Sequence, residues 1–174
     1  MRKITNVVIH SSDSAWGSAD VIRKWHTDPK PQGNGWKTPG YHYVILNTFP
    51  TYDNWRRRTA IRENDGVVES LVPLDQDDWL EPDEIANHAY GYNQFSIGIC
   101  CISKHGLFTW KQIKSLQETC WTILQRHETL HSNSFLGHYE TTTGRAQGKT
   151  CPGFDMNDLR EYLMNRIRLK NANR

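Results

Sequence analysis

Two runs of β-branched and aliphatic residues constrain the fold of this chain more than any other feature. Asn6 to His10 reads NVVIH and stops at a Ser-Ser-Asp-Ser cluster, while Ser96 to Ile102 reads SIGICCI. Short apolar runs bounded by turn residues predict buried strands. Because His10 closes the first run, we expect its imidazole at the end of a strand, where functional sites are often built.

Helical patterns lie between and after these runs. Ser18 can cap a helix over residues 19–26, and Thr109 opens a capping box ahead of a long amphipathic repeat that extends to about His131. Asp155 can cap a last helix. The apolar face of that helix comprises Leu159, Tyr162, Leu163 and Ile167.

The remaining segments complete the predicted architecture. Residues 41–46 predict a further strand, and residues 47–64 form an inserted excursion in a hairpin whose second arm starts at about Val67. The polar, Gly- and Thr-rich residues 137–153 predict a loop. Since strands and helices interleave, we expect an α/β fold: one domain over residues 1–174, with a small mixed central β-sheet flanked by helices.

Charge and hydropathy exclude several classes of protein. Twenty-one Lys plus Arg against 19 Asp plus Glu leave a net charge of +2, so no single-sign field draws the chain onto nucleic acid. The triplet Arg56-Arg57-Arg58 is interpreted as a solvated surface. No apolar run approaches the roughly 18 residues that a membrane span needs, and we expect no membrane insertion.

Cysteine usage and the amino terminus predict the compartment. The first apolar stretch is three residues long, whereas a secretory signal needs about seven. Four unevenly spaced cysteines do not resemble a disulfide framework, and Cys100, Cys101 and Cys120 are expected to be buried thiols. A cytoplasmic protein without a signal peptide is therefore predicted.

Three residues of the right chemistry can hold a metal. His10, His138 and Cys151 supply two imidazoles and a thiolate, a set that suits zinc and leaves one tetrahedral position for water. Eight histidines offer many such triples, however, and no tight ligand motif is present. On spacing alone, ordinary hydrogen-bonded histidines and a buried thiol are the more frequent arrangement, and the spacing does not by itself select the metal site.

Five motifs in series give a more specific signal. In order along the chain they are VIHSS at 8–12, PGYHYVI at 39–45, HAYGYN at 88–93 with SIGI at 96–99, GH at 137–138, and KTCPGFD at 149–155. This series resembles the type-2 N-acetylmuramoyl-L-alanine amidases, a family of phage lysozyme-type amidases, bacterial recycling amidases and animal peptidoglycan recognition proteins. The resemblance covers about Val7 to Asp155 and implies a zinc site in a surface groove.

The resemblance also implies roles for individual residues. It places the single zinc ion on His10, His138 and Cys151, and it places Tyr41 and Lys149 beside the metal as the catalytic pair. Some relatives have a carboxylate after the S-I-G motif, whereas Ile99 and Cys100 follow here, which favours Tyr41 as the group that handles the proton of water.

Other residues near the motifs have more than one interpretation. His88 can line the groove and contact substrate, or support the site from behind, or be purely structural. His42 is expected to point away from Tyr41, and Asn93 to fix a turn. Loop tryptophans such as Trp36 can stack on sugars or close small clusters, and the sequence assigns no site to them.

The expected function is hydrolysis of the amide bond between N-acetylmuramic acid and L-alanine in peptidoglycan. The compact chain resembles phage endolysins, which reach the wall after a separate protein permeabilises the membrane. A cytosolic muropeptide-recycling amidase is the alternative within the family, and a non-catalytic peptidoglycan-binding module is the alternative outside it. Non-catalytic members typically lack the thiolate, so Cys151 argues against the last. The partner is then peptidoglycan or a muropeptide, and we expect a monomer.

Overall fold

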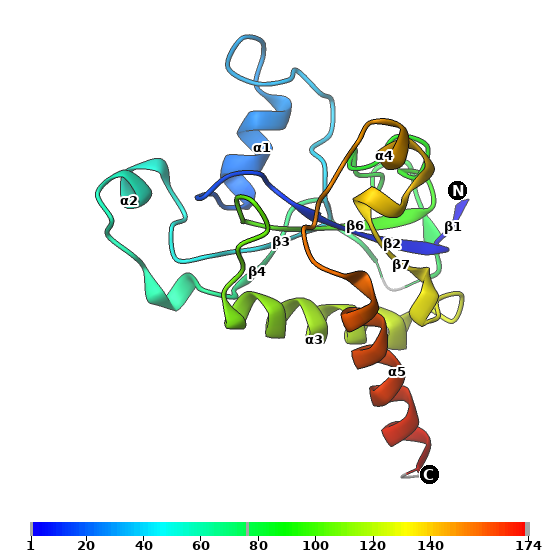
Figure 1. Cartoon of the computed structure of the whole chain (residues 1–174). Coiled ribbons are helices and arrows are strands. Elements are labelled where there is room, and N and C mark those ends of the chain that lie inside the picture. Colours follow the sequence, from blue (N-terminus) through cyan, green and yellow to red (C-terminus); the bar gives the residue numbers. More distant parts are fainter. Residues whose placement is uncertain (1, 76, 173–174) are drawn as a thin grey trace.

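The computed structural model describes residues 2–75 and 77–172 and has a mixed five-stranded sheet at its centre (Figure 1). The strand order is β4-β3-β6-β2-β7. Four strands are parallel, namely β2 (Asn6–Ser11), β3 (Tyr43–Ile45), β6 (Ser96–Cys101) and β7 (Phe135–Gly137). At one edge β4 (Val68–Ser70) pairs antiparallel with β3, and β1 (Arg2–Lys3) pairs separately with β5 (Trp79–Leu80).

Helices cover both faces of the sheet, which confirms the predicted α/β fold. The helices α3 (Trp110–Arg126) and α5 (Met156–Ala172) lie on one face, and α1 (Ala19–Thr27) lies on the other (Figure 1). The short elements are α2 (Tyr52–Arg56), α4 (Thr142–Ala146) and the 3-10 turns η1 (Arg62–Asn64), η2 (Ser132–Ser134) and η3 (His138–Glu140).

The alternation of side chains along β2 separates the core from the site. Val7 and Ile9 are fully buried in the core beneath α3 and α5. Successive side chains of a strand point to opposite faces, so Val8 and His10 point to the other side of the sheet. In β6, the strand paired with β2, Gly98 lies opposite Val8 and Cys100 opposite His10. This face therefore carries the candidate site.

The long helix begins as predicted and ends earlier. The Thr109 hydroxyl oxygen accepts a hydrogen bond from the Gln112 backbone amide at 3.1 Å. The side-chain oxygen of Gln112 in turn accepts from the Thr109 backbone amide, which completes the capping box. The prediction that α3 extends to about His131 is wrong, because it ends at Arg126. His127 instead approaches Asp78 at 3.2 Å, and Leu130 reaches the core from a turn rather than from the helix.

The other sequence predictions are partly confirmed. Ser18 caps α1, Asp155 accepts from the Asn157 amide at the start of α5, and β3 and β4 form the hairpin with α2 and η1 inserted between them. The strand expected over 41–46 is shorter. The prediction of a plain loop over 137–153 is wrong, because Thr141 caps the helix α4 through the Gly144 amide.

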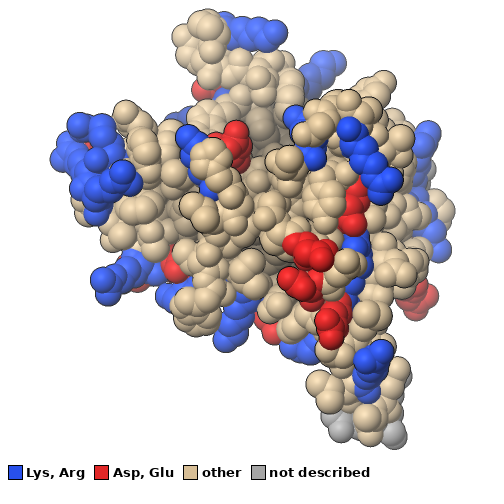
Figure 2. Space-filling view, viewed as in Figure 1, with Lys and Arg blue, Asp and Glu red and all other residues tan. Residues whose placement is uncertain are grey.

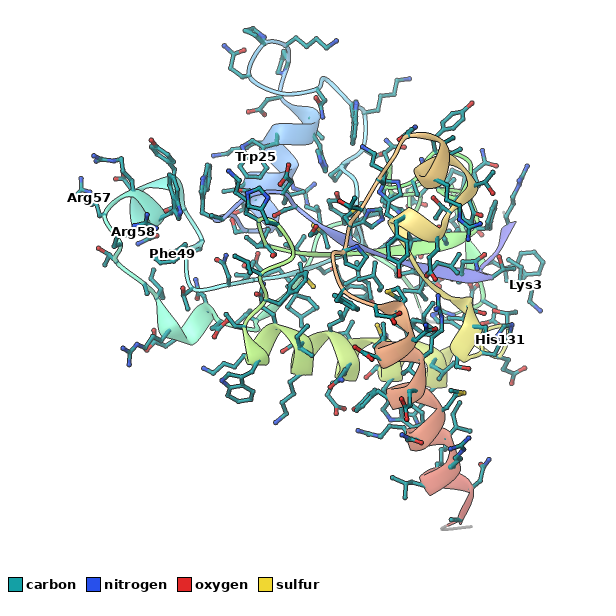
Figure 3. All side chains as sticks on the ribbon, in the orientation of Figure 1. Lys3, Trp25, Phe49, Arg57, Arg58 and His131 are labelled. Atoms are coloured by element: carbon teal, nitrogen blue, oxygen red, sulfur yellow. The ribbon has the colours of Figure 1, made fainter. Side chains whose placement is uncertain are left out.

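One group of exposed cations lies on the lobe that contains α2 (Figure 2). Lys and Arg side chains gather over this lobe, where Arg57 extends outward (Figure 3) and the Arg58 guanidinium lies 5.5 Å from the centroid of the Trp55 ring. Asp53 lies 3.7 Å from Arg56 and 3.8 Å from Arg57, in exposed pairs that contribute little to stability. No helix among residues 2–75 and 77–172 is long and apolar enough to cross a bilayer.

Candidate metal centre

Two parallel strands bring His10 and His138 together. His10 lies near the carboxyl end of β2, and His138 follows β7 directly. Because Ile9 pairs with Gly137, the next residue of each chain segment lies at the same edge of the sheet. The two imidazole centroids are 4.5 Å apart. The carboxyl ends of parallel strands are where α/β proteins place their ligand sites.

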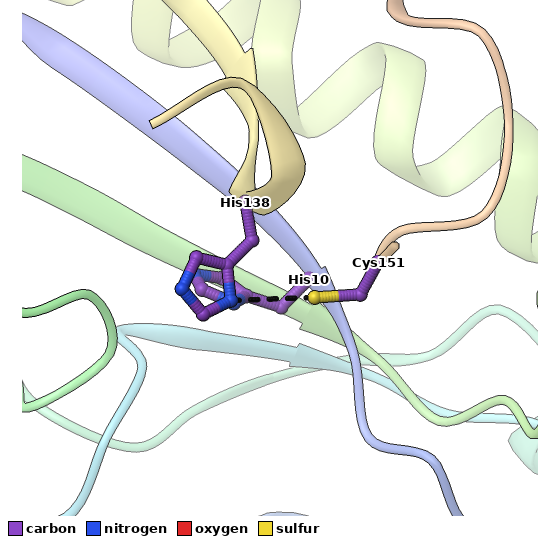
Figure 4. Close-up of side chains that lie close together, drawn as sticks. All are labelled: His10, His138 and Cys151. Carbon is purple, nitrogen blue, oxygen red and sulfur yellow. Dashed lines mark hydrogen bonds between the residues drawn. The ribbon is translucent and has the colours of Figure 1, made fainter. Parts of the chain in front are cut away.

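Cys151 completes the cluster from a loop. Its Sγ lies 3.3 Å from Nδ1 of His138 (Figure 4), and its carbonyl accepts a hydrogen bond from the Tyr139 amide at 3.1 Å. One potential ligand atom from each of His10, His138 and Cys151 lies within 4.8 Å of the others. The three residues singled out from the sequence are thus neighbours in space, although they are 128 and 13 positions apart in the chain.

The chemistry of this set fits zinc. Tetrahedral zinc with bonds of about 2.0–2.3 Å places its ligand atoms about 3.3–3.8 Å apart, so small side-chain rotations bring the cluster to that geometry. Two nitrogen donors and one sulfur donor suit zinc, and three protein ligands leave one position open to the groove.

The protonation states of the histidines favour metal binding. Burial holds the pKa of His10 well below its ordinary value, and neighbouring His88, His138 and Lys149 lower it further. Burial, followed by Lys149, also lowers the pKa of His138. Both imidazoles are therefore neutral near pH 7 and keep a lone pair.

The pKa of the Cys151 thiol is subject to opposing effects. Burial raises its pKa, while a backbone hydrogen bond from Ser11 and the nearby Lys149 cation lower it. A thiol that coordinates a metal is deprotonated outright, so a bound cation would override the effect of burial.

His88 lies behind His10 and is 8% exposed. Its Nδ1 is 3.2 Å from Nε2 of His10, and its Nε2 is 3.3 Å from the carbonyl oxygen of Ser96. Burial lowers its pKa to about 3. The side chain of Asn93 accepts hydrogen bonds from the His88 and Ala89 amides at 3.0 and 2.7 Å, which confirms that Asn93 fixes a turn.

Tyr41 points toward the cluster from a left-handed backbone conformation, with φ of 79°. Its ring centroid is 5.1 Å from that of His10. Burial raises the pKa of its hydroxyl well above the ordinary value, and Cys100 and Cys151 raise it further. The hydroxyl is therefore protonated at neutral pH and suited to donate a hydrogen bond. Neighbouring His42 points elsewhere, to the Glu84 carbonyl and the Gly98 amide.

The cluster opens into a groove of about 750 Å³. Lys149 lies on the groove wall and is exposed, two residues before Cys151. Sequence reasoning missed His26 and left Trp36 without a role, yet both line the groove, with their rings stacked at 4.7 Å. The His26 ring accepts from the Gly40 amide, and its helical position gave no sign that it would reach a site.

An α/β fold that brings two imidazoles and a thiol together at the carboxyl ends of parallel strands, beside a groove, defines a candidate metal centre. The family model described as N-acetylmuramoyl-L-alanine amidase matches residues 1–154, and the chain belongs to this family. The resemblance noted in the sequence is thereby confirmed.

Individual relatives agree with the family. The endolysins of Enterobacteria phage T3 and Escherichia phage T7 are each 28% identical over 144 residues, which cover 78% of this chain and 69% of the relative. The solved structure of LysC, an N-acetylmuramoyl-L-alanine amidase from Clostridium intestinale URNW, matches with a TM-score of 0.65 at 18% identity. That match covers 92% of this chain and 85% of LysC, and it shows a shared fold.

Proposed function

We propose that this protein is a zinc-dependent N-acetylmuramoyl-L-alanine amidase that acts as a phage endolysin. It hydrolyses the amide between the lactyl carbonyl of N-acetylmuramic acid and L-alanine, which separates stem peptides from glycan strands. The similarity to the T3 and T7 endolysins supports the lytic role.

One observation carries the proposal: His10, His138 and Cys151 converge within 4.8 Å at the wall of the large groove. A purely structural zinc site is closed by four protein ligands, whereas a catalytic site keeps a position open. The described residues provide three such ligands beside a groove, which is the arrangement of a hydrolytic centre.

The chain's own residues have distinct tasks in this reaction. His10, His138 and Cys151 would hold zinc, which when bound supplies the Lewis acidity that activates water near neutral pH and polarises a carbonyl. As negative charge grows on the amide oxygen, the Tyr41 hydroxyl donates a hydrogen bond to it and the Lys149 ammonium stabilises it electrostatically. Attack by water releases one proton and the departing L-alanine amine takes one up, and Tyr41 is the group to which the motif pattern assigns this proton transfer.

The groove suits a glycopeptide. Beyond the metal cluster it continues into a second hollow that shares Trp36, His88 and Lys149 with the first and adds Lys37 and Tyr90. Trp36 is 40% exposed and offers an aromatic face to a sugar or peptide. Lys37 and Lys149 offer positive charge to the carboxylates of a stem peptide.

Product analysis tests the proposal. Purified sacculi are incubated with zinc-loaded protein, with protein treated with a chelator, and with the Cys151→Ser variant, and the released material is identified by mass spectrometry. Free peptides that begin with L-alanine are expected from the zinc-loaded protein alone. If the protein sediments with sacculi but releases no peptide, the proposed amidase activity is contradicted and a binding module is supported.

A second substrate separates the two amidase roles. Soluble muropeptides are compared with sacculi under the same conditions. An endolysin is expected to cleave intact sacculi. Cleavage of soluble fragments alone would instead support the role of a muropeptide-recycling amidase.

A further inference from the structure

A chain of hydrogen-bonding groups runs from the candidate metal cluster into the protein. Nε2 of His10 lies 3.2 Å from Nδ1 of His88. On its other side, Nε2 of His88 lies 3.3 Å from the carbonyl oxygen and 3.2 Å from Oγ of Ser96. The Ser96 hydroxyl in turn donates to the Tyr92 carbonyl at 2.7 Å.

The last group in this chain sets the direction of every hydrogen bond before it. The Ser96 hydroxyl has one proton, which is committed to the Tyr92 carbonyl, and the Ser96 carbonyl can only accept. Neither group can donate to His88, so Nε2 of His88 must carry the proton. In a neutral imidazole the other nitrogen is then an acceptor. Nδ1 of His88 therefore accepts from His10, whose proton lies on Nε2.

The consequence reaches the metal cluster. Once Nε2 of His10 is protonated and faces His88, Nδ1 is the ring nitrogen that retains a lone pair for a metal. Histidine ligands commonly donate their second ring nitrogen to a partner that fixes their tautomer and orientation. Here the partner is another histidine rather than a carboxylate, and its own tautomer is fixed by Ser96.

The packing around His88 holds it in this position. Gly98 in β6 leaves the space that the imidazole fills, because a Cβ at position 98 would lie 2.5 Å from Cγ of His88. Asn93 fixes the backbone at His88 from the other side. A ring confined by a strand, a turn and hydrogen bonds to His10 and Ser96 is a rigid support for His10.

We propose that His88 is a positioning residue that fixes His10 in the Nε2-protonated tautomer and presents Nδ1 to the metal. This inference rests on the proposed zinc centre. Of the three interpretations that the sequence left open for His88, this one is support of the metal ligands from behind. A direct contact with substrate is then not its main role.

Zinc affinity, measured by competition with a chelating dye, tests this role without reference to activity. His88→Phe keeps a flat ring over Gly98 but removes the acceptor, and we expect zinc affinity to fall about 10- to 100-fold. His88→Gln can accept through its amide oxygen and is expected to recover part of the loss. His127→Phe is the matched control, because it removes a buried imidazole that pairs with Asp78 and contacts neither His10 nor His88, and its zinc affinity should match the wild type.

The outcomes separate the inference from the proposed function. If the wild type binds no zinc, the proposed function fails. If the wild type and a folded His88→Phe protein bind zinc equally tightly, the inference alone fails.

Nitrogen-15 NMR of the zinc-loaded wild type decides the matter even if the variants do not fold. We expect the proton of His10 on Nε2 and the metal on Nδ1, with the proton of His88 on Nε2. A His10 protonated on Nδ1 would overturn the proposal.

Discussion

Replacement of Gly98 by alanine tests how closely the sheet and the metal cluster are coupled. Gly98 lies in the central strand and does not have the left-handed backbone that favours glycine, so alanine is acceptable to the backbone. The new methyl carbon, however, would lie 2.5, 2.7 and 2.9 Å from Cγ, Cδ2 and Nδ1 of His88. These separations are far below van der Waals contact, and the buried ring must move.

The cost follows from the packing. Forcing an extra methyl group into a filled core costs about 1–3 kcal/mol, which corresponds to a decrease in Tm of about 2–12 °C for a chain of this length. Since Nδ1 of His88 faces His10, the displaced ring should also weaken zinc binding. Urea unfolding of the metal-free protein gives the first quantity, and chelator competition gives the second.

A double-mutant cycle isolates the contact. In a His88→Ala background the methyl group added at position 98 has no ring to displace, so the Gly98→Ala cost should largely disappear. The reasoning is refuted if Gly98→Ala is as stable as the wild type, or if it costs the same with and without the His88 ring.

Three further predictions concern the cluster and its surroundings. Cys151→Ser should lose stoichiometric zinc, as measured by elemental analysis after dialysis, and retention of one zinc per chain would exclude Cys151 as a ligand. Tyr41→Phe and Lys149→Met should each keep zinc but lower kcat about 100- to 1000-fold on a defined muropeptide, and a loss under threefold would remove that residue from the transition state. Burial lowers the pKa of His42 to about 4; because the unfolded chain then binds more protons, stability of the metal-free protein should fall between about pH 6.5 and 4, by roughly 2–3 kcal/mol from His42 alone. Urea unfolding across that range checks the slope, which should be shallower in His42→Gln.

The elements that the sequence predicted well are those whose signal is local. The buried strand at 96–101 and the capping box at Thr109 are each determined by a few neighbouring residues, and both are observed. The helix end at Arg126 depends instead on Asp78, which binds His127 from a distant loop. Periodicity alone could not show that contact, because Leu130 continues the apolar pattern after the helix has stopped.

The residues of the site likewise divide into those that the sequence could identify and those that only the folded chain brings together. Motif order singled out His10, His138 and Cys151, and the register of β2 with β7 explains why two of them meet. Trp36 reaches the groove from the segment after α1, where its ring stacks on that of His26 in the last turn of the helix, and no local pattern encodes this contact. The donor direction at His88 likewise depends on the Ser96 hydroxyl, whose partner Tyr92 is visible only in the folded chain.

Hydrolysis in oxygen-18 water tests the central claim most directly. Zinc-loaded protein and a defined muropeptide are incubated in labelled water, and the masses of both products are measured by mass spectrometry. Amide hydrolysis at the lactyl carbonyl predicts one labelled oxygen in the carboxylate of the muramic acid product and none in the released peptide, whose L-alanine gains a free amine. Cleavage of a glycosidic bond, or label at a newly formed peptide carboxyl terminus, with the lactyl amide intact would contradict the account, since it would identify a glycosidase or a peptidase instead.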